Sequence, residues 1–499
     1  GLTSFEFGIF ILFGVVLYYT VFRGQQWKLL LVLSYLYYAA ADVKNVIFLL
    51  AVTIITYTAG CILDRDMEKK KRKRIVAAAL FLDFLILGVL KYTDFLIDNI
   101  NRIFHGNISM LELVLPLGLS FFTFQSAGYL LDVYWKKTKA EKNFFRYALF
   151  VAWFPQIMQG PIGRFERLAH QFEGTHRFQM ENIERGLQLI LYGLFKKMIL
   201  ADNAAMFVDH IFHQYETFDG LVLAGVLAYS IQLYGDFSGG IDVVRGVSYL
   251  FGIVLDENFR QPYFAVSITD FWHRWHITLG TWFKDYIFYP VSLAKPVKNF
   301  AKKVKNRFGR GVSKFVAPFA ALFCVWSCNG LWHGPHWTYI FYGMYYFVLI
   351  FLENILEEPV TKLTAKLKIN REGKGYRIFR LIKLLVIVNL GEMFFRAETV
   401  GTGFAMLGRI LTNFHITELG DHIYSLGMDR YDAAVALIGI LIVLVVDILH
   451  EKNIQIRKAI SGWALPARWV FWYAAIFIVI IFGAYGAGYT VVDMIYAGY

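Results

Sequence analysis

The chain has 499 residues, of which 57% are hydrophobic and only 18% are charged, and its formal net charge is +12. A soluble protein of this composition could not cover its surface with polar groups, which excludes an ordinary set of soluble domains. Basic residues gather in the cytoplasmic loops of membrane proteins, so we attribute the positive charge to topology and expect no nucleic-acid partner.

Apolar segments recur along the whole chain, and most have about the 20 residues that a helix needs to cross the hydrocarbon core. We therefore predict an all-α fold, a polytopic membrane bundle of about 11–13 spans including re-entrant segments, forming one domain over residues 1–499. The first segment is followed by Arg23-Gly24-Gln25-Gln26 instead of small residues, which predicts a retained span and not a signal peptide. The predicted segments lie near residues 5–22, 27–41, 45–63, 75–92, 111–132, 145–160, 185–203, 220–236, 315–333, 336–356, 379–396, 432–449 and 467–490.

Three basic loops set the predicted orientation. Residues 65–74 carry seven basic residues, residues 135–142 carry four, and residues 295–314 carry eight with no acidic residue. All three should be cytoplasmic, which places the N-terminus and the loop 94–110 outside the cytoplasm. An odd number of predicted spans separates the second basic loop from the third. We therefore expect either a re-entrant segment there or a further span near 247–265.

The stretch "CNGLWHGPHW", residues 328–337, combines two histidines with a helix breaker. Pro335 disfavours a helical Gly334, so a helix from about 315 should end near His333, with Pro335 in the first turn of the next helix. The freed backbone groups need protein or water around them, so we expect His333 to face a polar cavity near the bilayer centre. A histidine beside a helix N-terminus suits a general base with an oxyanion stabiliser. A histidine hydrogen-bonded between packed helices is the alternative.

The same stretch contains a superficial zinc pattern, C-x3-C-x4-H-x2-H, formed by Cys324, Cys328, His333 and His336. The predicted helix break separates His336 from the cysteines, and the spacing is not that of a zinc finger. Small residues four apart are typical of close helix packing in membranes. We therefore predict no metal site.

Aromatic residues recur at helical spacing in residues 268–290, with His276 on a narrower polar stripe beside them. This pattern predicts a helix that lies at the membrane interface or dips in from the cytoplasmic side. His276 either lines a cytoplasmic mouth where a polar donor enters, or belongs to a helix that is merely anchored by tryptophans.

Charged residues also follow the apolar segment 220–236, where Ser238-Gly239-Gly240 predicts a break. Asp236 and Asp242 lie close in sequence to Arg245, so an Asp–Arg structural pair is one interpretation of these charges.

Two further segments combine a break or a charge with apolar sequence. Gly160-Pro161 predicts another break. Glu392 and Arg396 lie one helical turn apart, so we expect them to pair with each other.

A Walker loop, a dinucleotide-binding fingerprint and a G-x-S-x-G elbow do not occur in a supporting context, which argues against nucleotide hydrolysis, redox cofactors and a serine hydrolase.

Several long motifs resemble the membrane-bound O-acyltransferases, in the same order along most of the chain from about residue 5 to 400. The likeness is greatest to the bacterial subgroup that contains the alginate O-acetyltransferase membrane subunit. The motifs are "LPLGLSFFTFQSAGYLLDVY" (115–134), "WFPQIMQGPIGRF" (153–165), "DFSGGIDVVRG" (236–246), "DFWHRWHITLGTWFKDYIFYP" (270–290), "NGLWHGPHWTYIFYGMYY" (329–346) and "FFRAE" (394–398).

The resemblance implies a bundle with a central tunnel or funnel, through which an acyl group passes from a cytoplasmic thioester to an acceptor outside. The family's invariant histidine falls on His333, as the base that deprotonates the acceptor hydroxyl. Its second histidine falls on His276, which would position or polarise the thioester. The residues predicted to line the substrate and donor tunnel are Gln125, Asp236, Ser238, Trp275, Asn329 and Trp332.

The resemblance also implies the donor, the partners and the location. The donor would be acetyl-CoA or an acyl carrier protein on the cytoplasmic side, with no permanently bound cofactor. The partners would be membrane lipids, an extracytoplasmic hydrolase-like acyltransferase and a polysaccharide or cell-wall glycan, at the bacterial cytoplasmic membrane. His273 and Gly240 depart from the family's usual basic residue and tyrosine, which bears on the donor mouth.

Two other functions stay open at this stage. The first is D-alanyl transfer from a carrier protein to teichoic acid. The second is a transporter or channel, because transporters also build sites from broken helices, although we find no internal duplication of the kind that many transporters have.

Overall fold

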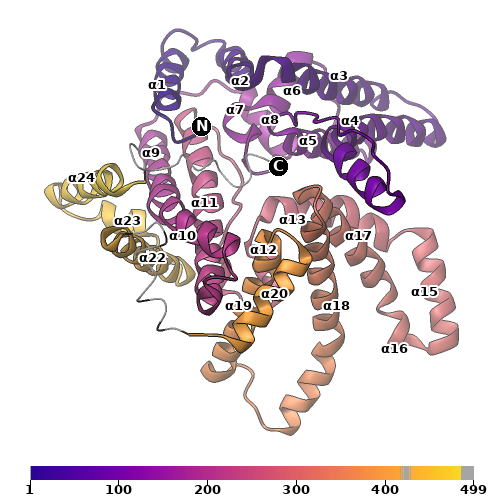
Figure 1. Ribbon diagram of the computed structural model, residues 1–499. Helices are drawn as coiled ribbons and strands as arrows, with labels where there is room; N and C mark the ends of the chain where they lie inside the picture. The colour runs from indigo at the N-terminus through magenta and orange to yellow at the C-terminus, as the bar shows by residue number, and fades with distance from the viewer. Residues whose placement is uncertain (1, 416, 418–419, 421–425, 427–428, 485–499) are drawn as a thin grey trace. The chain divides into compact units, whose positions relative to one another are not determined.

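The computed structural model describes residues 2–415, 417, 420, 426 and 429–484 (Figure 1). Helices make up nearly all of its regular structure, and an isolated antiparallel bridge joins Phe259 to Trp275. Within these residues, seven helices are long and apolar enough to cross a membrane. They confirm the predicted all-α polytopic membrane protein. The seven cover Val43–Leu63, Lys69–Phe104, Asp219–Leu250, Arg310–His333, Trp337–Lys366, Arg430–Glu451 and Leu465–Phe482.

Internal contacts divide the chain into two compact units. The first contains residues 1–193 and 240–256, and the second contains residues 194–239 and 257–492. One helix, α11 (Val222–Leu250), begins in the second unit and ends in the first. The single domain over residues 1–499 stays a prediction, as does the tunnel.

The first unit contains the N-terminal helices. Within it α3, α4 and α5 pack against one another, and α2 packs against α6. The helices are α1 (Phe5–Tyr19), α2 (Gln26–Asp42), α3 (Val46–Leu63), α4 (Lys69–Phe104), α5 (Leu119–Tyr134), α6 (Phe144–Ala152), α7 (Phe154–Ile157), α8 (Phe165–Glu173) and α9 (Met180–Leu194).

Three expectations for this unit need correction. The prediction of a loop over residues 94–110 is wrong for its first part, because α4 continues to Phe104. Its C-cap residue, His105, has φ 49°. The segment 111–132 is helical only from Leu119, after Gly118 at φ 69°. The segment 145–160 is divided between α6 and α7. Neither half reaches the ~30 Å of the hydrocarbon core at about 1.5 Å per residue, which favours the re-entrant explanation of the odd span count.

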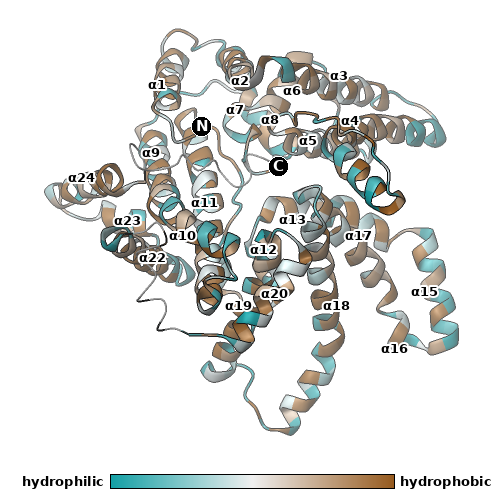
Figure 2. Ribbon diagram, in the orientation of Figure 1, coloured by the Kyte–Doolittle hydropathy of each residue, from teal (hydrophilic) through white to brown (hydrophobic). Residues whose placement is uncertain are grey.

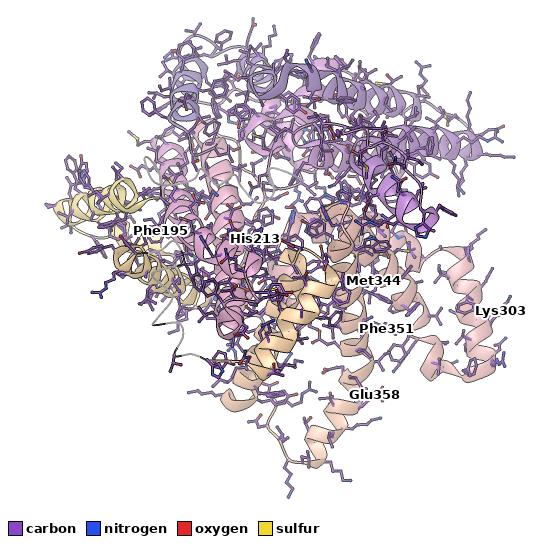
Figure 3. The ribbon with its side chains drawn as sticks, viewed as in Figure 1. Phe195, His213, Lys303, Met344, Phe351 and Glu358 are labelled. Atoms are coloured by element: carbon purple, nitrogen blue, oxygen red, sulfur yellow. The ribbon has the colours of Figure 1, made fainter. Side chains whose placement is uncertain are left out.

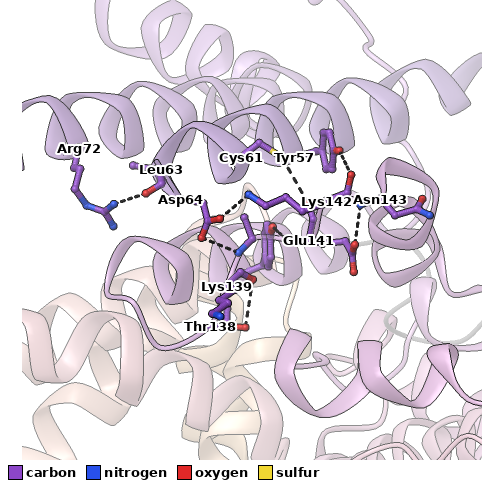
Figure 4. Close-up of polar contacts among 12 residues, drawn as sticks. Tyr57, Cys61, Leu63, Asp64, Arg72, Thr138, Lys139, Glu141, Lys142 and Asn143 are labelled. Carbon is purple, nitrogen blue, oxygen red and sulfur yellow. Dashed lines mark hydrogen bonds and ion pairs between the residues drawn. The ribbon is translucent and has the colours of Figure 1, made fainter. Parts of the chain in front are cut away.

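The first two basic loops meet within this unit, as expected for segments on one side of a membrane (Figure 4). Lys142 forms an ion pair with Asp64 at 2.5 Å, and this interaction lowers the pKa of the Asp64 carboxyl. Arg72 donates hydrogen bonds to the carbonyl oxygens of Leu63 and, at 2.8 Å, of Tyr134. The carbonyl groups at the ends of α3 and α5 therefore find a cationic partner, as the negative end of a helix dipole favours.

The second unit contains the remaining helices and two π-helices. The π-helices are η2 (Phe195–Ala201) and η5 (Lys284–Phe288). The α-helices are α10 (Asp202–His213), most of α11, α12 (Ile268–Arg274), α13 (Ile277–Phe283), α14 (Tyr289–Ser292), α15 (Lys295–Phe308), α16 (Arg310–Ser313), α17 (Val316–His333), α18 (Trp337–Lys366), α19 (Lys374–Arg396), α20 (Val400–Thr412), α22 (Arg430–Glu451), α23 (Ile456–Ser461) and α24 (Leu465–Phe482). The last six residues of the predicted segment 467–490 lie outside the described part of the chain.

Helices α17 and α18 form a closely packed hairpin. A Cβ atom added at Gly343 would lie 2.3 Å from the carbonyl oxygen of Trp326, so only glycine allows this approach. Phe351, labelled on α18 in Figure 3, packs its ring 5.1 Å from the ring of Phe319 on α17. Figure 2 shows that α17 is mostly apolar, whereas polar residues mark α15, which carries much of the third basic loop. Side-chain packing between α17 and α18 therefore holds the end of α17 in place.

Helix α11 overturns two sequence expectations. The prediction of a helix break at Ser238-Gly239-Gly240 is wrong, because α11 continues without interruption to Leu250. Small residues are tolerated inside membrane helices, where all backbone hydrogen bonds stay within the helix and neighbouring helices approach closely. Gly235 lies against the carbonyl oxygen of Lys196, 3.0 Å from where a Cβ atom would stand. The alternative prediction, a further membrane span near residues 247–265, is also wrong, because the helix ends at Leu250.

Candidate active site

His333 is the last residue of α17, and the helix break predicted there is confirmed. Gly334 has φ 154° and ψ 174°, a conformation that is essentially restricted to glycine. Helix α18 begins at Trp337 with His336 as its N-cap residue, so Pro335 precedes the cap. The placement of Pro335 in the first turn is therefore wrong. Its fixed φ instead shapes the extended link between the helices.

The imidazole of His333 is buried among aromatic rings that three helices supply. The rings of Phe395 on α19 and Tyr342 on α18 stand edge-on to it, with centroids at 4.9 Å and 5.7 Å. The rings of Trp332 and Tyr339 lie at 5.0 Å and 6.2 Å. This surround fixes the orientation of the imidazole by packing. The polar cavity expected beside His333 stays a prediction.

His276 lies at a break that the sequence did not predict. The single helix expected over 268–290 is wrong, because Trp275 is extended and His276 has φ 46°, in the left-handed region. Asn258 supplies the reason: its carbonyl oxygen accepts from the Ile277 amide at 3.0 Å, and its Oδ1 accepts from the Thr278 amide at 3.0 Å. These tertiary hydrogen bonds outweigh the helical pattern. A left-handed residue of this kind is a strain typical of functional sites.

The same contact fixes the tautomer of His276. The Thr278 amide can only donate, so the Asn258 atom that it contacts is the amide oxygen. That oxygen lies 3.2 Å from Nδ1 of His276, which must therefore carry the proton. Burial lowers the pKa of His276 to about 3, so the ring is neutral near neutral pH and its Nε2 carries a lone pair.

Trp332 connects the two histidines within the second unit. Its ring centroid lies 5.4 Å from that of His276 and 5.0 Å from that of His333. Asn329 precedes His333 by four residues and so shares its face of α17. Its side chain is buried, and its Oδ1 has no hydrogen-bond partner among the described residues. The structure thus brings together four of the predicted site residues: His276, His333, Trp332 and Asn329.

Trp275 packs beside this group. Its ring stacks on Phe271 with centroids 5.6 Å apart and meets Phe259 edge-on at 5.1 Å. Phe237 on α11 lies 4.8 Å from the His276 ring and 6.4 Å from Trp275. Trp275 therefore belongs to the group of aromatic rings that packs beside His276.

Asp236 and Ser238 bind two lysines that the sequence analysis missed. Lys197 forms ion pairs with Asp236 at 2.6 Å and with Asp202 at 2.7 Å, and its side chain is only 2% exposed. Lys196 donates to Ser238 Oγ at 2.9 Å. Both lysines lie on the π-helix η2, a form often found at functional sites. The sequence signal that could have revealed these contacts was the presence of two lysines inside the apolar segment 185–203. Asp236 thus pairs with a lysine, and it is Asp242 that lies near Arg245, at 3.9 Å.

Glu392 is a second buried group whose partners the sequence did not indicate. Its carboxylate accepts hydrogen bonds from the hydroxyl groups of Ser230 and, at 3.4 Å, of Tyr263. Arg396 instead pairs with Asp209. The expected pairing of Glu392 with Arg396 is therefore wrong, because both residues find better partners on other segments of the fold.

Gln125 belongs to the first unit, where its amide nitrogen donates to the Phe150 carbonyl and its oxygen accepts from Gln156. No group of three or more His, Cys, Asp or Glu side chains that could hold a metal ion occurs in the described parts of the chain. Cys324 and Cys328 lie on α17 with their thiols unpaired by disulfides. Of the predicted site residues, Gln125 thus belongs to the first unit, and His276 and His333 belong to the second.

Comparison with known proteins identifies the family of the chain. The model of the membrane-bound O-acyltransferase family matches residues 139–387, which include both histidines. The chain is 32% identical to the probable alginate O-acetylase AlgI of Pseudomonas syringae pv. tomato, over 81% of this chain and 74% of that protein. The chain belongs to the membrane-bound O-acyltransferase family. It is therefore an O-acyltransferase.

Two further relatives of this O-acyltransferase differ in their named reactions. The peptidoglycan O-acetyltransferase of Helicobacter pylori is 30% identical over 76% of this chain and 73% of its own length. The teichoic acid D-alanyltransferase of Bacillus subtilis is 31% identical, but over 50% of this chain and 61% of its own length. Relatives of the enzyme thus transfer acetyl or D-alanyl groups to cell-surface polymers.

Proposed function

We propose that this O-acyltransferase transfers an acetyl group from a cytoplasmic thioester toward a hydroxyl of an extracellular polysaccharide or cell-wall glycan. The observation that carries the proposal is the buried His333 at a glycine-restricted helix break, in ring contact with Trp332, which also contacts His276. Acetyl is favoured over D-alanyl because the likeness to the acetylases extends over 413 residues, against 252 for the D-alanyltransferase.

His333 would act as the general base. The acceptor oxygen attacks the thioester carbonyl carbon while an imidazole nitrogen takes the hydroxyl proton, the carbon–sulfur bond breaks, and the thiolate leaves and is then protonated. The aromatic rings around His333 hold the imidazole in one orientation and exclude water that would hydrolyse the thioester. Asn329, with a buried Oδ1 on the same helix face, is placed to accept a hydrogen bond from the acceptor.

His276 would position the donor. With the proton on Nδ1, the neutral ring offers Nε2 as an acceptor, which can bind an N–H or S–H group but cannot donate to the thioester oxygen. This favours positioning over polarisation of the carbonyl. Acetyl-CoA and an acyl carrier protein both present a phosphopantetheine arm with amide N–H groups, so either donor fits this role.

The partners and the location form part of the same proposal. The enzyme would lie in the bacterial cytoplasmic membrane with its N-terminus outside, consistent with the first two basic loops meeting at one end of the first unit. An extracytoplasmic hydrolase-like acyltransferase would complete transfer to the glycan.

A donor assay tests the proposal. Membranes that contain the enzyme and its extracytoplasmic partner would be supplied with acetyl-CoA, acetylated acyl carrier protein or D-alanylated carrier protein, together with an oligosaccharide acceptor. We expect acetyl transfer to the acceptor from acetyl-CoA or acetylated acyl carrier protein, and little transfer from the D-alanylated carrier protein. Preferential use of the D-alanyl carrier would overturn the choice of acetyl, and transfer from no thioester donor would overturn the proposal as a whole.

Replacing His276 by asparagine separates its backbone role from its ring. Asparagine tolerates the left-handed conformation, so His276→Asn should fold, whereas a β-branched residue would be strained. Loss of one hydrogen bond to the donor should raise the donor KM by about five- to tenfold, with a smaller change in kcat. Initial rates against donor concentration measure this split, and unchanged donor kinetics in a folded His276→Asn enzyme would refute the positioning role.

A further inference from the structure

Helix α4 carries a buried carboxylate that the proposed reaction does not use. The buried residues of this helix are Val76, Ala79, Asp83, Leu87 and Lys91, which recur every three or four residues and so form one stripe. The Asp83 side chain is fully buried, and neither of its oxygens has a hydrogen-bond partner among the described residues. The helix is a candidate membrane span, so the carboxylate lies at membrane depth. An ionisable residue there usually marks a functional site.

Hydroxyl groups from neighbouring helices surround this position. Thr123 and Ser126 lie on one face of α5, which packs against α4, and both hydroxyls are buried. Tyr147 on α6 donates to Thr56 Oγ1 on α3 at 2.7 Å. The Tyr147 hydroxyl lies next to Ser126 and within electrostatic range of Asp83. Phe84, beside Asp83, packs on Phe124, which lies between Thr123 and Ser126 in the sequence, with ring centroids 5.8 Å apart. Hydroxyl oxygens from α3, α5 and α6, all in the first unit, thus lie near the Asp83 carboxylate of α4.

Asp83 forms no ion pair with a lysine or arginine among the described residues. Lys91 lies eight residues further along the same stripe, roughly 12 Å away along the helix axis, and donates to Ser120 Oγ at 3.2 Å. The titratable side chains of α3, α5 and α6 are Tyr57, Cys61, Tyr129, Asp132, Tyr134, Arg146 and Tyr147. The cation among them, Arg146, lies 5.6 Å from the centre of the Trp27 ring and 3.8 Å from the Glu173 carboxylate, so its charge is already engaged away from Asp83. A buried ionised carboxylate needs a partner of opposite charge or a bound metal ion.

We propose that Asp83, with the hydroxyl groups of Thr123, Ser126 and Tyr147, forms a binding site for a monovalent cation of the Na⁺ type. All of the donor atoms are oxygens, which suit hard cations, and nitrogen and sulfur ligands are absent from this cluster. One carboxylate supplies one negative charge. Sites for Ca²⁺ and Mg²⁺ use additional carboxylates, so the charge favours a monovalent ion. The bound ion would join α4, α5 and α6 and so stabilise the first unit.

A thermal-unfolding titration of the full-length protein in detergent tests the site. NaCl would be compared with choline chloride at equal ionic strength and mildly alkaline pH. A ligand that binds only the folded state stabilises it by mass action, so we expect Na⁺ to raise the Tm by roughly 4 °C or more at saturation. Asp83→Asn, which removes the charge and keeps the shape, should abolish the Na⁺ response.

A matched control and a second variant complete the experiment. Asp98→Asn removes an exposed carboxylate on the same helix and should keep the wild-type response. If Asp83→Asn does not fold, the Ser126→Ala/Thr123→Val double variant should bind radioactive ²²Na⁺ more weakly than the wild type. Absence of a Na⁺ effect in the wild type, or an equal effect in Asp83→Asn, would show that Asp83 is held as a neutral acid and would overturn the site. Neither readout depends on acyl transfer, so this outcome leaves the proposed function untouched.

Discussion

His333→Gln should reduce acyl transfer by about 10²–10⁴-fold while the protein stays folded, because a glutamine of similar size can hydrogen-bond but cannot take up a proton. The side chain is 3% exposed and lies in an aromatic surround, so no neighbouring group or bulk water can readily replace the imidazole as the base. Initial rates of acetyl transfer in proteoliposomes measure the effect.

His336→Gln is the matched control for this experiment. His336 is the N-cap residue of α18, three positions further along, and its side chain makes no capping hydrogen bond. We expect this variant to keep most of the wild-type rate. A His333→Gln enzyme that is folded and transfers acetyl at the wild-type rate would remove His333 from the reaction, whatever the behaviour of the control.

Lys197→Met should destabilise the protein by about 3–5 kcal/mol, because it leaves the carboxylates of Asp202 and Asp236, which are 12% and 2% exposed, without their common partner. Lys197 is 2% exposed, so solvent cannot screen the two remaining charges. Thermal unfolding in detergent should show a marked fall in Tm. Asp236 adjoins Phe237, whose ring packs on His276, so donor turnover should fall as well.

Charge-balanced variants distinguish the lost ion pairs from lost packing. Adding Asp236→Asn and Asp202→Asn to Lys197→Met removes the uncompensated charges, and we expect part of the stability to return. Lys303→Met, at an exposed position on α15 (Figure 3), should leave the Tm nearly unchanged. If the charge-balanced variant is no more stable than Lys197→Met alone, packing of the lysine stem, and not its charge, would account for the loss.

Where local chemistry alone decides the backbone, the sequence predicted the fold well. Apolar runs of membrane length predicted the seven long helices, and Gly334-Pro335 predicted the end of α17 at His333. The Gly160-Pro161 break is also present, since α7 ends at Ile157 and the next helix begins at Phe165. Proline and its preceding residue restrict the chain whatever surrounds them, so these signals survive folding.

Where distant segments compete with a local pattern, the sequence misled. The pattern of residues 268–290 is helical, yet hydrogen bonds from Asn258 break the helix at His276. The glycines after Ser238 predicted a break, yet the backbone in a membrane gains most by staying helical.

The charges show the same division. The sequence by itself determined that ionisable groups stand at membrane depth and that His333 closes a helix, because composition and proline geometry are local properties. Only the tertiary structure decided that Lys197 pairs with Asp236, that Glu392 meets Ser230 and not Arg396, and that Trp332 contacts both histidines. A buried charge takes the best partner that packing brings within reach, and that partner is set by which helices meet and not by spacing along one of them.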